Sequence, residues 1–203
     1  MTRIAIISGS TRPHRSSQAV ASWVLEAGQQ VAPHGVSLEL VDLAAFGLPV
    51  LDEPVPAMAG IVEHEHTRRW AHVIGSFDGY VFVTPEYNHS VPGALKNAID
   101  YVFYEWNDKA VGFVSYGVHG GVRAVEQLRQ VAAEVKLADV RSQVALSIYT
   151  DFDYTGLDLT DPATSGVFTP SDHHVTELAA VLEEVTAWSR ALSSIRPALV
   201  DQR

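Results

Sequence analysis

Residues 80–97 read Tyr80-Val81-Phe82-Val83-Thr84-Pro85-Glu86-Tyr87-Asn88-His89-Ser90-Val91-Pro92-Gly93-Ala94-Leu95-Lys96-Asn97. The first four are apolar and rich in β-branched and aromatic side chains, as in a strand buried on both faces. Pro85 lacks an N–H and fixes its own φ, so the strand should end there, whereas Pro92 suits the first turn of a helix. The segment between the prolines is therefore predicted to be a rigid loop at the carboxyl edge of a buried strand, where ligands bind in open α/β sheets.

A second loop of this kind follows the predicted strand Arg3–Ile7 and reads Ser8-Gly9-Ser10-Thr11-Arg12-Pro13-His14-Arg15-Ser16-Ser17-Gln18. After Ser17 the apolar residues recur at helical spacing. Backbone N–H groups and hydroxyls would converge on the positive end of the helix dipole, and an arginine can clamp two phosphate oxygens. The loop thus predicts an anion site, and the alternative is that Ser16 or Ser17 merely caps the helix. It is neither a P-loop nor the dinucleotide fingerprint, because it has no Gly-Lys-Ser/Thr and no spaced glycines.

Composition narrows the class of protein. The chain has 203 residues, no cysteine and a formal net charge of −10. This length fits one domain, residues 1–203, and the lack of cysteine fits a cytoplasmic protein without disulfides or cysteine–metal sites. The acidic balance argues against a nucleic-acid partner. We also expect no membrane association and no signal peptide, because the apolar runs are too short.

Strand and helix patterns alternate along the chain. The sequence predicts strands at 3–7, 36–41, 80–84, 111–115 and 144–148, with 36–41 nearer an edge. Helices are expected after Ser17, over 61–75, over 92–104, and around 125–135 and 178–188; 44–60 and 150–170 are expected to be long loops. This alternation predicts an α/β fold, a doubly wound five-stranded parallel sheet of order 2-1-3-4-5 with helices on both faces.

Four motifs together resemble the NADPH-dependent FMN reductase family, the flavodoxin-like group that includes quinone, azo-dye and chromate reductases. They are Gly9-Ser10-x-Arg12 with Ser16-Ser17, Pro85-Glu86-Tyr87-Asn88, the run from Pro92 to Asp100, and Gly117-x-x-Gly120-Gly121. The resemblance covers residues 2–195. It implies a flavodoxin-like FMN-binding domain that passes a hydride from NADPH or NADH through FMN to a soluble acceptor such as a quinone. The alternative class is a flavodoxin-like electron carrier or redox-responsive flavin-binding protein.

The resemblance also assigns residues to the cofactor. Ser10, Arg12, Ser16, Ser17 and Gln18 would hold the FMN phosphate, and Pro85, Glu86, Tyr87 and Asn88 would line the isoalloxazine. Ser115, Gly117, Gly120 and Gly121 would lie at the other edge of the ring, where glycine permits close approach of the backbone. The chemistry belongs to the flavin, so no side chain is assigned as catalytic acid or base. Of the tyrosines that could stack on ligand, Tyr87 is favoured over Tyr116.

Several histidines could suggest a metal site, but the sequence predicts none. His64 and His66 would point in different directions on a helix, and the surface reading is favoured for them and for His72. His173 and His174 are interpreted as surface residues near a helix start. The 92–104 segment, by contrast, looks too apolar for a monomer surface and predicts a homodimer, or a tetramer of dimers, with this helix at a two-fold interface.

Overall fold

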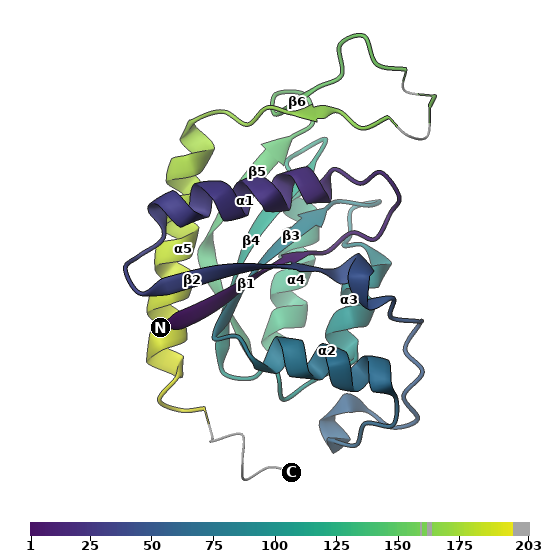
Figure 1. Cartoon of the computed structure of the whole chain (residues 1–203), viewed down its shortest axis with the longest axis vertical. Helices are drawn as coiled ribbons and strands as arrows, with labels where there is room; N and C mark the ends of the chain where they lie inside the picture. Colours follow the sequence, from purple (N-terminus) through teal and green to yellow (C-terminus); the bar gives the residue numbers. More distant parts are fainter. Residues whose placement is uncertain (159, 162–163, 197–203) are drawn as a thin grey trace.

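Five parallel strands form one sheet of order β2-β1-β3-β4-β5 in this computed structural model, as the sequence predicts (Figure 1). They are β1 (Thr2–Ser8), β2 (Val36–Asp42), β3 (Gly79–Pro85), β4 (Lys109–Gly117) and β5 (Leu137–Ser147). The structure describes residues 1–158, 160–161 and 164–196. The central strands β1, β3 and β4 are buried along almost their whole length, whereas the edge strand β2 keeps exposed side chains.

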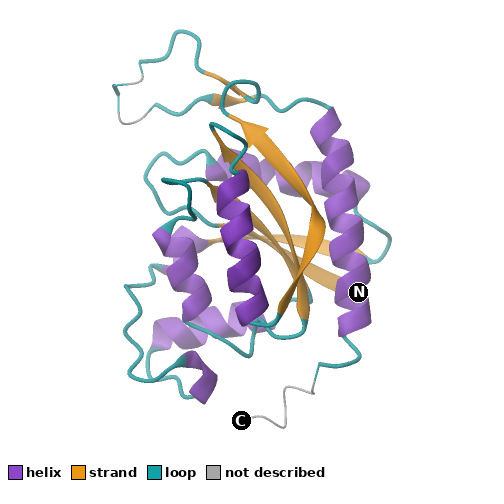
Figure 2. Cartoon of the chain, turned by 180° about the vertical axis from the view of Figure 1, so that it is seen from behind, coloured by secondary structure: helices purple, strands orange, loops and turns teal. Residues whose placement is uncertain are grey.

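Helices cover both faces of the sheet (Figure 2). On one face, α1 (Ser17–Val31) and α5 (His173–Leu192) pack over a core that includes Ile4 and Ile6 of β1. On the other face, α2 (Glu65–Gly75), α3 (Gly93–Asp100) and α4 (Val122–Glu134) pack over a core that includes Ala5 and Ile7. Successive residues of β1 therefore enter opposite cores, which explains why the strand is apolar throughout rather than alternating.

Three elements differ from the predicted bounds. The helix expected over 61–75 begins only at Glu65, and the helix expected over 92–104 ends at Asp100, where the chain enters a series of turns. β5 begins at Leu137 rather than at 144, and its first residues pair with β4 across a register shift between Val111 and Phe113. The polar residues of that first half hid it from a search for apolar runs.

The apolar pattern of residues 92–106 belongs to the core of this chain and not to a surface. Five of its large side chains are at most 3% exposed: Leu95, Ile99, Tyr101, Val102 and Trp106. Trp106 folds back and donates from Nε1 to the carbonyl of Ile99 at 3.1 Å. Tyr104 alone of the aromatic residues at 101, 104 and 106 is exposed, at 43%. These buried side chains therefore give no support to a two-fold interface at this helix, and the dimer stays a prediction.

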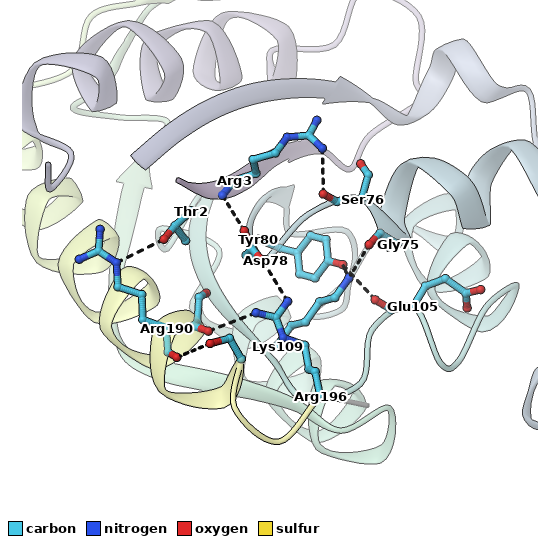
Figure 3. A network of polar contacts seen from close by, with 12 residues as sticks. Thr2, Arg3, Gly75, Ser76, Asp78, Tyr80, Glu105, Lys109, Arg190 and Arg196 are labelled. Carbon is cyan, nitrogen blue, oxygen red and sulfur yellow. Dashed lines mark hydrogen bonds and ion pairs between the residues drawn. The ribbon is translucent and has the colours of Figure 1, made fainter. Parts of the chain in front are cut away.

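A polar network closes the amino-terminal end of the sheet (Figure 3). Lys109 at the start of β4 is 4% exposed, and its Nζ donates to the carbonyls of Ile74 (3.2 Å) and Gly75 (3.3 Å) at the end of α2. The Tyr80 hydroxyl lies 3.0 Å from the same nitrogen and donates to the Ile74 carbonyl at 2.8 Å. Burial lowers the pKa of Lys109 to about 7. These bonds fasten α2 to the sheet at the end opposite to the ligand loops.

The two predicted long loops contain short structured pieces. Residues 44–60 overlap two 3₁₀ turns, Leu43–Phe46 and Ala57–Ala59. Within 150–170, β6 (Phe152–Asp153) and β7 (Val167–Phe168) form a small antiparallel ribbon beyond the end of β5 (Figure 1); residues 159 and 162–163 lie outside the described part. Within the described part of the chain, no helix combines the length and apolar character needed to cross a membrane.

Candidate functional site

A pocket of about 350 Å³ opens at the carboxyl edge of the sheet, where the loops after β1, β3, β4 and β5 converge. The strand order reverses between β1 and β3, and in doubly wound folds this switch point is where ligands bind. The pocket is lined by Arg12, Pro13, His14, Arg15, Ser16, Pro85, Glu86, Tyr87, Tyr116, Gly117, Val118, Ile148, Phe152, Tyr154, Thr164, Ser165 and Gly166. Cationic, hydroxyl and aromatic groups thus share one cavity.

The loop after β1 is held against the sheet by glycine and serine. The N–H of Gly9 donates to the carbonyl of Val83 at 2.9 Å, and a Cβ at this position would lie 2.8 Å from Leu95, so only glycine fits without a shift. The buried Ser10 hydroxyl lies 3.0 Å from the Tyr87 hydroxyl, which joins the first loop to the loop after β3. Two loops distant in sequence are thereby fixed relative to each other.

The serines at the start of α1 do not cap it through their side chains. Ser16 occupies the N-cap position but forms no side-chain cap hydrogen bond. The Ser17 hydroxyl is buried and accepts a hydrogen bond from the Ser8 hydroxyl at 3.0 Å. The capping alternative is therefore wrong. The first-turn N–H groups have no intrahelical partners, as at every helix start, and lie beside the pocket that Ser16 lines.

Arg15 is a pocket residue that the sequence reasoning missed. Its side chain is 11% exposed, and Nη2 forms an ion pair with the Asp42 carboxylate at 2.6 Å. Its Nε is buried and has no hydrogen-bond partner among the described residues. A buried donor without a partner is costly, which fits a site that receives an anion. The signal in the sequence was a second basic residue in the same loop as Arg12.

A two-residue turn shapes the tip of the loop after β3. Tyr87 and Ser90 exchange backbone hydrogen bonds of 2.8 and 3.0 Å. Asn88 and His89 between them have φ values of 50° and 68°, in the left-handed region that asparagine tolerates well. The turn places Tyr87 on the pocket, 36% exposed, and carries Asn88 outward.

Glu86 fixes the same loop to the start of α4. Its carboxylate accepts hydrogen bonds from the backbone N–H of Arg123 at 3.0 Å and from the Arg123 guanidinium at 2.7 Å. Burial alone would raise the pKa of Glu86, but the Arg123 hydrogen bonds outweigh it and lower the pKa. The Glu86 carboxylate is therefore bound to Arg123, and the backbone N–H of Glu86 donates to the carbonyl of Tyr116 at 3.1 Å, so both groups hold the loop in place.

The loop after β4 separates into a part on the pocket and a part behind it. Gly117 lines the pocket, whereas Gly120 and Gly121 have φ of 72° and 71° and pack against β4 and β5. A Cβ on Gly121 would lie within 3.0 Å of the Tyr116 backbone. The Ser115 hydroxyl is buried and donates to the Gly120 carbonyl at 2.6 Å. These residues hold the turn that presents Gly117.

Tyr116 also lines the pocket and is 7% exposed. Its burial raises the pKa of its hydroxyl far above the ordinary value, although a hydrogen bond with Ser17 acts in the opposite direction. The phenol is thus a neutral, fixed group on the pocket wall. His119, by contrast, is exposed on the neighbouring turn.

The loop 150–170 supplies an aromatic wall that the sequence did not predict. The Phe152 ring lies 6.0 Å from Tyr116, 6.5 Å from Tyr154 and 5.0 Å from Phe168. The wall is anchored to α5 through Asp151, whose carboxylate lies 2.9 Å from Nε2 of His174. Burial would raise the pKa of Asp151, but hydrogen bonds from Thr150 and Ser147 help to lower it.

Two histidine predictions were wrong in part. His174 is 4% exposed and not a surface residue, because it packs under the 150–170 loop as the partner of Asp151. His64 and His66 do not point apart: their rings stack at 5.1 Å, and both contact Asp52. The reason is that His64 precedes α2 and takes an extended conformation, so helical spacing does not apply to the pair.

The structure divides the predicted site residues into three groups. Arg12, Ser16, Pro85, Glu86, Tyr87 and Gly117 line the pocket; Ser10, Ser17, Ser115, Gly120 and Gly121 are buried behind its loops; Gln18 and Asn88 are exposed beyond it.

Comparisons with known proteins identify the family of this chain. The family model for NADPH-dependent FMN reductase matches residues 2–151. An NAD(P)H-dependent FMN reductase of Nectria sp. is 39% identical over 158 residues, which is 74% of this chain and 79% of that protein. A quinone reductase of Pseudomonas putida is 37% identical over 134 residues, 63% of this chain and 67% of the relative.

Among solved structures, the flavoenzyme NAD(P)H:(acceptor) oxidoreductase FerB of Paracoccus denitrificans superposes with a TM-score of 0.69 at 19% identity. The match covers 94% of this chain and 98% of that one, and at this identity it shows the shared flavodoxin-like fold. The family match and the curated relatives show more: the chain belongs to the NADPH-dependent FMN reductase family.

Proposed function

We propose that the protein binds one FMN in the 350 Å³ pocket and transfers a hydride from NADPH or NADH to a soluble, quinone-like acceptor. One observation carries the proposal. The loops after β1, β3 and β4, each a separate cofactor segment by resemblance, meet in a single cavity at the switch point of the sheet. Membership of a reductase family and a relative described as a quinone reductase support the donor and the acceptor class.

The residues present fit FMN. Arg12, Arg15 and Ser16 give the pocket two cations and a hydroxyl beside the first turn of α1, a donor set suited to a phosphate. The buried Nε of Arg15 supports this fit, because it has no hydrogen-bond acceptor among the described residues and a bound phosphate would supply one. Tyr87, Tyr116 and Phe152 add aromatic surface suited to a flat ring.

Bound FMN would supply the hydride chemistry, and the protein would supply position and surroundings. Pro85, Tyr87 and Gly117 would orient the ring, and the part-buried Glu86–Arg123 pair would keep their loop rigid. The aromatic wall with Phe152 and Tyr154 would exclude water on one side. No side chain in the pocket is required to donate or remove a proton in the hydride step.

The competing proposal is an electron carrier, and reduction by a nicotinamide separates the two. The FMN-loaded protein is mixed anaerobically with NADPH or NADH, and the visible absorbance of the flavin is followed. The reductase proposal expects rapid bleaching by at least one donor and full recovery on addition of a quinone. Flavin that dithionite bleaches but neither nicotinamide does would favour the carrier.

A homodimer and a cytoplasmic location complete the proposal. Support for a dimer now comes from exposed apolar side chains in and next to the 44–60 loop: Val50, Leu51, Met58, Ile61 and Tyr104 are exposed at 87%, 45%, 60%, 57% and 43%. Tyr104 donates to the carbonyl of Met58 at 2.8 Å, so the two segments are joined. Light scattering should give twice the chain mass, and Ile61→Asp should give a monomer. A monomeric parent protein would contradict the dimer.

A cytoplasmic location follows from the proposed need for NADPH or NADH, and fluorescence of a tagged chain in cells tests it.

A further inference from the structure

Among the described residues, one group of three ligand-type side chains converges outside the pocket: His173, His174 and Glu177 at the start of α5. One nitrogen or oxygen from each lies within 4.8 Å of the others. His173 and Glu177 are four residues apart and share a helix face, and the His173 and His174 rings lie 3.9 Å apart. Two imidazoles and a carboxylate are a ligand set typical of Zn²⁺.

The buried His174 is already oriented as a metal ligand would be. Its Nε2 faces the Asp151 carboxylate at 2.9 Å, and its Nδ1 faces Glu177 at 2.8 Å. Asp151 is held in turn by the Ser147 N–H at 2.8 Å and the Thr150 hydroxyl at 2.9 Å. A histidine that donates one N–H to a buried carboxylate, with its other nitrogen on the ion, is the usual outer arrangement of zinc sites.

We propose that His173, His174 (through Nδ1) and Glu177 bind a Zn²⁺ ion, with Asp151 orienting the His174 ring and water completing the coordination. His173 is exposed and the Glu177 side chain is 44% exposed, so the ion can enter and water can remain bound. In a bound site the two imidazoles would be neutral ligands and the Glu177 carboxylate would supply one negative charge, a combination that suits a divalent cation.

The proposed zinc site is connected to the pocket through Asp151. Asp151 immediately precedes Phe152 of the aromatic wall, and its carbonyl accepts a hydrogen bond from the Thr169 N–H at 2.9 Å. An ion that fixes His174 therefore also fixes both ends of the 150–170 loop on α5. We expect Zn²⁺ to raise the thermal unfolding midpoint, whether or not FMN is bound.

The test is calorimetric titration of the tag-free, FMN-loaded chain with Zn²⁺, and with Mg²⁺ for comparison. The proposal expects one Zn²⁺ per chain and no Mg²⁺ binding, because two of the ligands are nitrogens. His173→Ala and Glu177→Gln should each weaken Zn²⁺ binding by about tenfold or more. Both side chains reach solvent, so these variants should fold and still bind FMN.

His64→Ala is the matched control, because His64 belongs to a second pair of neighbouring histidine rings among the described residues, that of His64 and His66. It should bind Zn²⁺ as the parent does, and Zn²⁺ should raise its unfolding midpoint equally. The proposal is overturned if the parent takes up no Zn²⁺, if Mg²⁺ binds equally well, or if His64→Ala loses binding while His173→Ala and Glu177→Gln retain it.

Discussion

Replacing Glu86 by Gln tests how the ligand loop after β3 is held. In the native protein the Glu86 carboxylate accepts two hydrogen bonds from Arg123, one of them from the first turn of α4, and its side chain is 10% exposed. Glutamine keeps one acceptor oxygen and loses the charge. The loss of one charge-assisted bond is worth about 1.5–3 kcal/mol, and the loss of a negative charge at a helix start about 0.3–1 kcal/mol.

Because the Arg123 side chain is 39% exposed, solvent replaces part of the lost interaction, and we expect about 2 kcal/mol of destabilisation at neutral pH. Urea unfolding of both proteins at matched conditions measures it. Glu126→Gln is the control on the same helix. The Glu126 side chain is 72% exposed and its carboxylate lies as far as 3.7 Å from Arg129, so the free energy of unfolding of this variant should differ little from that of the parent protein.

The pH dependence gives a second readout with a defined sign. The folded-state pKa of Glu86 is lowered, so the carboxylate stabilises the fold above its unfolded pKa, near 4.5. This contribution is lost as the pH falls from there through the lowered folded pKa. The stability difference between the parent protein and Glu86→Gln should therefore shrink below pH 4.5. A difference under about 0.5 kcal/mol at neutral pH, or one that grows in acid, would refute this reasoning.

Three further outcomes follow from the structure. Arg12→Ala should weaken FMN binding about 10- to 100-fold in a fluorescence titration, because a charge-assisted phosphate contact is worth about 1.5–3 kcal/mol; unchanged affinity would remove Arg12 from the site. The lowered pKa of Lys109, about 7 against 10.5, means that the unfolded chain binds more protons in this interval, so stability should rise with pH between these values. Lys109→Met should abolish that rise, and an equal rise in both proteins would contradict it. Gly166→Ala would place a Cβ 2.6 Å from the Tyr154 ring, so it should displace that ring and lower kcat/KM for the quinone. The control is Gly93→Ala, whose Cβ meets nothing within 4 Å and should leave kcat/KM unchanged. Equal kcat/KM values in the two variants would exclude Tyr154 from the wall.

The sheet and its ligand edge could be predicted because they depend on local signals. Buried parallel strands are apolar throughout, and Pro85 and Pro92 mark where strand and helix meet. The order of the strands then follows from the loops that must share a switch point. The structure confirms the order 2-1-3-4-5, and the pocket includes residues from the two loops that were singled out.

The parts that could not be predicted depend on contacts between distant residues. The pair of His174 and Asp151 joins positions 23 apart, so neither residue alone signals that the histidine is buried. An apolar helix face such as that of Leu95 and Ile99 has the same sequence pattern whether it packs in the core of its own chain or against another subunit. Arg15 pairs with Asp42 at the end of β2, 27 positions further along the chain, and no local pattern reveals such a partner.

The most direct test of the central claim is anaerobic stopped-flow reduction of the FMN-loaded protein by NADPH and by NADH. The account predicts that at least one donor bleaches one flavin per chain within the turnover time of the enzyme. It also predicts that mixing the reduced protein with a quinone restores the absorbance, and that Arg12→Ala needs more FMN to reach the same amplitude. Flavin that stays oxidised with both donors, or FMN that binds with the same affinity after Arg12 and Arg15 are both replaced by Ala, would contradict the proposed site and function.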